Sequence, residues 1–212
     1  MKKLLTTALA IIVYYSANAQ YDANALAVLD AMSARFKKME AFQVVWQERL
    51  VNKAAGVDEM DESRRKITVK GKQFVLEIPD VDQILFYNGE VLHRFSPSVN
   101  EVYIVEDFDP EIEFDIRFDQ IYDIYKDGYK YALLETKSNG DRVVLLNPED
   151  RDAEFINIEM TINSQDLIDS FLIRSDGGNN NIYQIHSIEE VSVTDDFFSF
   201  DFKNNPNVEV VK

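Results

Sequence analysis

The chain contains no cysteine, only two histidines, one tryptophan and seven glycines among its 212 residues. Without cysteine it has no disulfides, cysteine nucleophiles, CxxC redox chemistry or cysteine-based metal sites. It also has no HExxH, no G-x-S-x-G and no glycine-rich phosphate loop. His93 and His186 lie in alternating, strand-like stretches, a pattern more typical of packed side chains than of a catalytic base. We therefore expect no catalysis, no cofactor and no metal site.

Basic residues are also scarce relative to acidic ones. There are 22 Lys and Arg against 38 Asp and Glu, and the formal net charge is −16. Such a surface repels nucleic acid and anionic lipid headgroups. The charge therefore excludes nucleic acid as an expected partner, and fits a solvated surface or a partner with a basic patch.

The first nineteen residues have the composition of a secretory signal peptide. Lys2 and Lys3 precede an apolar run over 4–13, and Ala17-Asn18-Ala19 supplies the small residues that signal peptidase requires, so we expect cleavage before Gln20. The apolar run is about half of the roughly 20 residues that cross a bilayer, which makes an uncleaved anchor the weaker alternative. Cleavage would remove two basic residues and no acidic one, giving a net charge of −18. We expect an exported, soluble chain with a single domain over 20–212, stabilised by its core alone.

Hydrophobic periodicity changes early in this domain. Apolar residues recur every three or four positions over 22–39, which predicts a helix with Asp22 as N-cap. Over 42–50 the period becomes two, which predicts a half-buried strand. Glu48 interrupts the apolar face of this strand, so we expect it near an edge or a mouth, or at a bulge.

Further strand patterns fill most of the remaining sequence. Asn88-Gly89 predicts a two-residue type I′ hairpin turn, in which both residues have positive φ. FINIEMTIN over 155–163 alternates cleanly, with Ile156 and Ile158 expected on one face. Helical spacing returns in mid-chain, at 118–126. One helix, about ten antiparallel strands and a mid-chain helical segment predict a mainly β (α+β) fold, a curved sheet or partly open barrel with helices over its mouth.

The order and spacing of these elements resemble the LolA-like outer-membrane lipoprotein carrier proteins. The resemblance covers essentially the whole chain after the signal peptide. It rests on the succession FQVVWQERL (42–50), ITVKGKQFVLEI (67–78), YNGEVLHRFSPSVNEVYI (87–104), YDIYKDGYKY (122–131), FINIEMTIN (155–163) and FDFKNNPNVEVV (200–211).

The resemblance implies a half-open antiparallel β-barrel of about eleven strands, with an N-terminal helix and mid-chain helices as a lid. It further implies a monomeric periplasmic carrier that binds the acyl chains of lipoproteins or related lipids and carries them from the inner to the outer membrane. The implied partners are an inner-membrane ABC-type exporter and an outer-membrane receptor. FFSFDF near the C-terminus is expected to form a final strand, and the VEVV that follows is expected to complete an edge.

Carried over to this sequence, the resemblance and the inward faces of the elements predict an apolar cavity. Its predicted lining is Leu29, Met32, Phe36, Val44, Trp46, Phe74, Leu76, Ile121, Ile124 and Tyr125. Known members carry an arginine that latches the lid at the place occupied here by Gly71, so Lys70 and Lys72 become the candidates for that latch.

An alternative remains open. The same fold could serve as an exported, non-catalytic interaction module whose concave face is filled by its own side chains.

Overall fold

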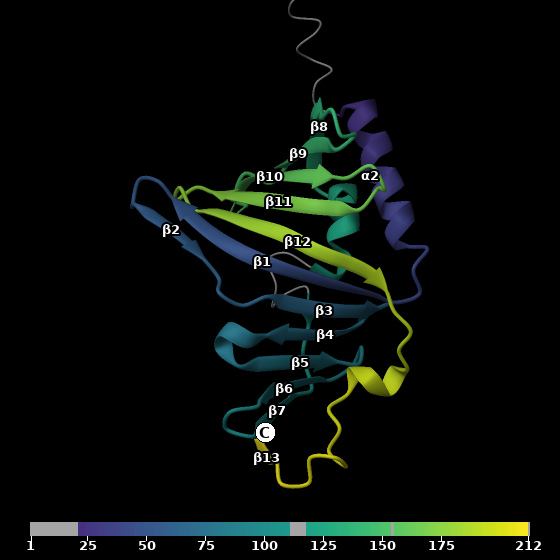
Figure 1. The fold of residues 1–212 in the computed structure, drawn as a ribbon, viewed down its shortest axis with the longest axis vertical. Helices are drawn as coiled ribbons and strands as arrows, with labels where there is room; N and C mark the ends of the chain where they lie inside the picture. Colours follow the sequence, from purple (N-terminus) through teal and green to yellow (C-terminus); the bar gives the residue numbers. More distant parts are fainter. Residues whose placement is uncertain (1–20, 111–117, 154, 212) are drawn as a thin grey trace, which may run out of the picture.

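The computed structural model describes residues 21–110, 118–153 and 155–211 (Figure 1). The predicted signal peptide and its cleavage site lie outside these residues. No helix in the described ranges is long and apolar enough to cross a membrane.

The strands of the described residues form one sheet, which is not closed into a barrel (Figure 1). Their order across the sheet is β13-β7-β6-β5-β4-β3-β1-β12-β11-β10-β9-β8, with β2 paired to the far end of β1. Neighbours are antiparallel except β13 and β7, which are parallel. The bounds are β1 Phe42–Asn52, β2 Val57–Met60, β3 Arg65–Lys70, β4 Gln73–Ile78, β5 Gln83–Tyr87, β6 Leu92–Ser96, β7 Glu101–Val105, β8 Tyr129–Thr136, β9 Arg142–Pro148, β10 Phe155–Ile162, β11 Ile168–Ser175, β12 Asn180–Glu190 and β13 Glu209–Val211.

The half-open, mainly β fold is thus confirmed, with thirteen strands in the described part of the chain instead of about eleven. Part of the excess follows from the length of β1. This strand continues to Asn52, beyond the reach of β3, and the four-residue β2 folds back to pair with Arg49–Asn52.

The expected N-terminal helix is α2, Ala23–Phe36. Asp22 caps it as predicted, because its carboxylate accepts a hydrogen bond from the Asn24 N–H at 2.8 Å. The second oxygen of Asp22 accepts from the Leu133 N–H at 3.1 Å and so ties the start of the helix to β8. The described residues also include three 3₁₀ segments: η1 Pro79–Val81, η2 Phe118–Lys126 and η3 Asp195–Phe198.

One continuous apolar core lies between the concave face of the sheet, α2 and η2. The predicted alternation of β10 holds for Ile158, Met160 and Ile162, which are fully buried, but fails for Ile156, which is half exposed. The pairing of β10 with β11 shifts register between Phe155 and Asn157, and this bulge turns Ile156 outward.

The C-terminal prediction is corrected in part. FFSFDF is not a strand: its first two residues end η3, and the rest is irregular. Its aromatic rings cover the outer face of the sheet, where Phe200 packs against Phe86 on β5 and Phe95 on β6 at centroid distances of 5.8 and 4.8 Å. The following residues do complete an edge, as β13.

Candidate apolar site between the sheet and the lid

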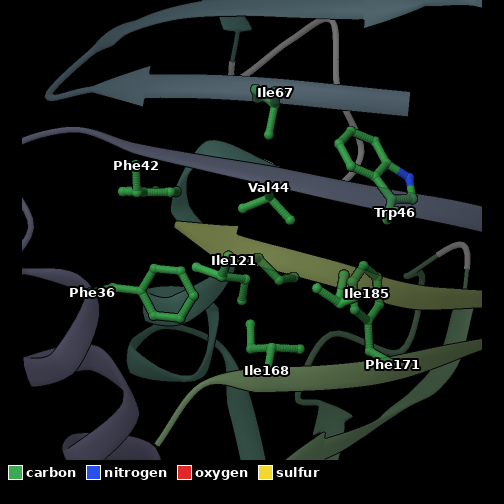
Figure 2. Close-up of a pocket in the computed structure, with 10 residues that line it drawn as sticks. Phe36, Phe42, Val44, Trp46, Ile67, Ile121, Ile168, Phe171 and Ile185 are labelled. Carbon is green, nitrogen blue, oxygen red and sulfur yellow. The ribbon is translucent and has the colours of Figure 1, made fainter. Parts of the chain in front are cut away.

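A narrow apolar pocket lies where η2, here called the lid, meets the concave face of the sheet. Its cavity volume is about 20 Å³, room for about one water molecule. Figure 2 shows side chains converging on it from the helix, the lid and the strands, with Phe36 at one end and Trp46 and Phe171 at the other. The lining residues are Phe36, Phe42, Val44, Trp46, Ile67, Ile121, Ile168, Phe171, Ile185 and Ile188.

Four of the predicted lining residues are at this pocket: Phe36 from α2, Val44 and Trp46 from β1, and Ile121 from the lid. Ile124 is partly buried and packs against the same core. The others are buried in that core away from the pocket: Leu29, Met32, Phe74, Leu76 and Tyr125.

The sequence prediction missed six lining residues. Phe42 and Ile67 belong to strand patterns that were already recognised, so the same alternation could have included them. The remaining four come from β11 and β12: Ile168, Phe171, Ile185 and Ile188. They lie beside β1 only because β12 pairs with it, a contact between segments about 140 residues apart that no local pattern reveals.

The lid is fastened to α2 by one aromatic contact and a small polar network. The rings of Phe36 and Tyr122 stack at 5.0 Å with an interplanar angle of 8°. Asp123 accepts a hydrogen bond from the Ser33 hydroxyl at 2.5 Å and forms ion pairs with Lys37 at 2.6 Å and Lys126 at 2.7 Å. Burial raises the pKa of Asp123, but the hydrogen bonds from Lys126, Lys37 and Ser33 outweigh it and hold the pKa below its ordinary value.

The two predicted latch lysines lie elsewhere. Lys70 forms an ion pair with Asp195 at 2.9 Å and lies 3.7 Å from Glu40. Both partners belong to connecting segments, so Lys70 joins β3 to the segment after β12 and not to the lid. Lys72 is exposed in the turn between β3 and β4. In the described part of the chain, the polar contacts between the lid and the α2 region involve Asp30, Ser33 and Lys37. Asp30 accepts a hydrogen bond from Tyr125 at 2.5 Å, and Ser33 and Lys37 contact Asp123.

A half-buried polar cluster adjoins the end of the pocket formed by Trp46 and Phe171. Glu48 accepts a hydrogen bond from Tyr183, its partner on β12, and pairs with Arg65. The Tyr183 ring stacks on Phe171 at 4.4 Å. Burial raises the pKa of Glu48, and the Arg65 charge and the Tyr183 hydrogen bond only partly offset it. The predicted interruption of the apolar face at Glu48 thus marks a polar end of the site, while the bulge in β1 lies earlier, between Val45 and Trp46.

Neither histidine contributes to this site. His93 lies on β6 against the Phe202 ring at 5.6 Å, and burial lowers its pKa. His186 is exposed on β12. In the described ranges, no group of three or more His, Asp or Glu side chains is arranged to hold a metal ion.

No family model and no curated protein sequence matches this chain. Several solved structures match its fold. A LolA superfamily protein from Nitrosomonas europaea is 14% identical over 84% of this chain and 98% of its own, with a TM-score of 0.42. A DUF1329 family protein from Desulfovibrio piger is 11% identical, with coverages of 82% and 97% and a TM-score of 0.44. The Mycobacterium tuberculosis lipoprotein LppX is 12% identical, with coverages of 81% and 98% and a TM-score of 0.41. The family that the sequence motifs resemble is thus among the matched structures.

Proposed function

We propose that this protein is a monomeric, non-catalytic carrier that binds the acyl chains of lipoproteins or related lipids between its sheet and its lid. It acts in the periplasm after removal of its signal peptide. It takes cargo from an ABC-type exporter in the inner membrane and delivers it to a receptor at the outer membrane.

The apolar pocket beneath the lid carries this proposal. Its ten lining residues are aliphatic or aromatic, and they come from the open sheet and from two separate covering elements. Burying one methylene away from water is favourable by about 0.8 kcal/mol, so moving a 16-carbon chain into water costs roughly 12 kcal/mol. Such a chain therefore crosses water very slowly by itself. A protected apolar face is what such cargo requires. The sequence resemblance to LolA-like carriers supports the same function.

The small cavity sets a condition on this function. A volume of about 20 Å³ cannot hold an acyl chain, so the lid must move away from the sheet before cargo enters. The contacts between the lid and α2 permit this movement, because Lys37, Lys126 and Asp123 keep part of their side chains in water at 48%, 44% and 26% exposure. Ion pairs of this kind contribute about 0–1 kcal/mol each.

Locking the lid tests the proposal directly. A hydrogen bond of 2.5 Å joins the side chains of Ser33 and Asp123, so Ser33→Cys together with Asp123→Cys brings two thiols close together in a chain with no other cysteine. Loss of free thiol on oxidation verifies that the disulfide has formed. We expect the oxidised double variant to take up a fluorescent fatty acid several-fold more slowly than the same protein after reduction. The two single variants, which cannot form the bridge, serve as controls for the loss of each side chain.

The outcomes separate the carrier from its alternative. Equal uptake by the oxidised and reduced double variant would show that cargo does not enter beneath the lid. No uptake by any form, including the unmodified chain, would remove the carrier function altogether.

The second candidate is an exported interaction module without lipid cargo. The observation that favours it is the same small cavity, since side chains already fill the concave face. Native mass spectrometry of the exported chain distinguishes the two candidates: co-purified lipid supports the carrier, and its absence together with no fatty-acid uptake supports the module.

A further inference from the structure

A second pocket, unlike the first in chemistry, lies between the start of α2, the end of the lid and the start of β8. Its volume is about 430 Å³. Pockets of about 300–1,000 Å³ are the usual size for small-molecule ligands. Four tyrosines line it: Tyr21, Tyr125, Tyr129 and Tyr131.

Three of the four tyrosine rings meet edge to face, with Tyr131 between the other two. Tyr131 meets Tyr21 edge to face at 5.6 Å and 79°, and meets Tyr125 at 6.3 Å and 79°. Tyr129 stacks on Phe155 at 6.4 Å, with an interplanar angle of 15°. Because the face of an aromatic ring carries negative charge density, rings in several orientations around one space favour a cation within it.

Three carboxylates complete the lining, from Asp30, Asp127 and Glu149. Tyr125 donates a hydrogen bond to Asp30 at 2.5 Å, and the Tyr21 hydroxyl donates to Glu149. A tyrosine whose proton is committed in this way presents only an acceptor to a ligand. Burial and the hydrogen bond to Asp30 raise the pKa of Tyr125, so its hydroxyl stays neutral.

The backbone places these groups independently of any ligand. The Tyr21 segment forms a parallel bridge with Tyr131, and the Asp22 N–H donates to the Tyr131 carbonyl at 3.2 Å. On the opposite side, the Glu149 N–H donates to the Gly128 carbonyl at 2.7 Å. The pocket is therefore preformed.

The charge of the pocket excludes an anionic ligand. Three lining carboxylates face a single lining ammonium, Lys126. That ammonium is already bound by Asp123 at 2.7 Å and lies 5.7 Å from the centre of the Tyr125 ring. A bare metal ion is also disfavoured, because no metal-ligating group of side chains occurs in the described ranges.

We propose that this tyrosine–carboxylate pocket binds an organic ammonium group, either on a free amine or on a lipid headgroup. The rings surround the cation and the carboxylates balance its charge. The proposal does not depend on acyl-chain transport, because the pocket and the apolar site have different lining residues.

Titration of the exported chain with tetramethylammonium chloride and ethylammonium chloride tests the site, followed by the NMR signals of the tyrosine rings. Sodium chloride at equal ionic strength is the reference. We expect saturable shifts with the organic cations only. Glu149→Gln and Tyr129→Leu should each weaken binding about three- to tenfold, as loss of a charge partner or of one cation–π face predicts.

Tyr131→Phe distinguishes a ring contact from a purely structural role, because it keeps the aromatic face and loses only the hydroxyl. It should bind as the unmodified chain does, whereas Tyr131→Leu should bind more weakly. Glu90→Gln, in the exposed hairpin between β5 and β6, is the matched charge control and should have no effect. Thermal unfolding of each variant verifies that it is folded.

Competition between tetramethylammonium and lipid vesicles shows where the ammonium group comes from. Displacement of bound tetramethylammonium by vesicles of phosphatidylethanolamine and phosphatidylglycerol, but not by phosphatidylglycerol alone, assigns the site to a lipid headgroup. Binding that vesicles leave unchanged assigns it to free amines. Shifts that sodium chloride reproduces, shifts unaffected by both pocket variants, or equal shifts with glucose would each overturn the proposal.

Discussion

The rings of Phe36 and Tyr122 lie almost parallel, with their centres 5.0 Å apart, and join the last residue of α2 to the middle of the lid. Phe36 also lines the apolar pocket and meets Phe42 edge to face at 5.2 Å. This aromatic stack therefore connects the helix, the lid and the first strand at one end of the site.

Removing that stack should loosen the lid before the rest of the fold. An aromatic pair contributes about 0.5–1.5 kcal/mol beyond its buried area, so Tyr122→Ala should speed amide exchange over 118–126 while the amides of the central strands stay protected. Tyr122→Phe keeps the ring and should behave as the unmodified chain. Tyr103→Ala, at an exposed tyrosine on β7, should leave lid exchange unchanged. Uniformly faster exchange across the sheet would show that the lid does not open independently.

Acidification should also release the lid. The pKa of Asp123 is lowered in the fold, so its contribution is fully present above the ordinary aspartate pKa of about 3.9 and is lost as the pH falls through the lowered value. Amide exchange of the lid, corrected for intrinsic rates, should therefore rise more than that of the strands below about pH 4.

Asp123→Asn is the control for this pH dependence. It removes the titrating group, so its lid should be loosened already at neutral pH and change little on acidification. Retention of the full acid response in this variant would show that Asp123 is not the group responsible.

The contribution of Glu48 to stability should depend on pH in the opposite direction to that of Asp123. Its pKa is raised by burial, so its ionised form weakens the fold at neutral pH, and this cost falls as the pH drops through the raised value towards the unfolded value of about 4.3. We therefore compare the free energies of unfolding of Glu48→Gln and the unmodified chain by urea unfolding. The variant should gain stability relative to the unmodified chain as the pH is raised from 4.5 to 7. Arg65 keeps its ion pairs with Asp61 at 3.1 Å and Asp80 at 2.9 Å in this variant. An equal difference at both pH values would contradict the raised pKa.

Neighbouring phenylalanines in η3 offer a matched pair for the outer face. Phe198 is fully buried and Phe197 is 40% exposed. Phe198→Ala should lower the free energy of unfolding by about 3–5 kcal/mol, and Phe197→Ala by less than about 1 kcal/mol. Similar losses for both would mean that the C-terminal segment does not cover the sheet as described.

Local patterns predicted most of the elements. The helix with its Asp22 cap, the strand at 42–50 and the helical spacing at 118–126 all depend on neighbours within a few residues, and all three are present. The Asn88-Gly89 hairpin is present too, but its turn differs. Only Gly89 has a positive φ, of 96°, and the Asn88 side chain accepts hydrogen bonds from the N–H groups of Glu90 and Val91.

Features that depend on distant pairing could not be predicted in this way. The alternation of FFSFDF is typical of a strand, yet its aromatic rings cover Phe86 and Phe95 on the outer face of the sheet. The sequence alone does not show that this part of the outer face needs to be covered. The resemblance predicts a latch at Lys70 or Lys72. The polar contacts between the lid and the α2 region instead join Asp123 to Ser33 and Lys37, and Tyr125 to Asp30, across about 90 residues of sequence. The tyrosine–carboxylate pocket likewise assembles from three separate stretches of the chain.

The tight packing beneath the lid has a consequence for the proposed carrier function, because the lining side chains would compete with an acyl chain for the same space. In that function, an acyl chain that enters beneath the lid displaces contacts that the lining side chains already make within the core, so the net affinity is the difference between two apolar interiors. On release of such a cargo, the same side chains would close again and leave no apolar surface facing water. This refilling would assist release, and a larger cavity would bind more tightly but deliver less readily.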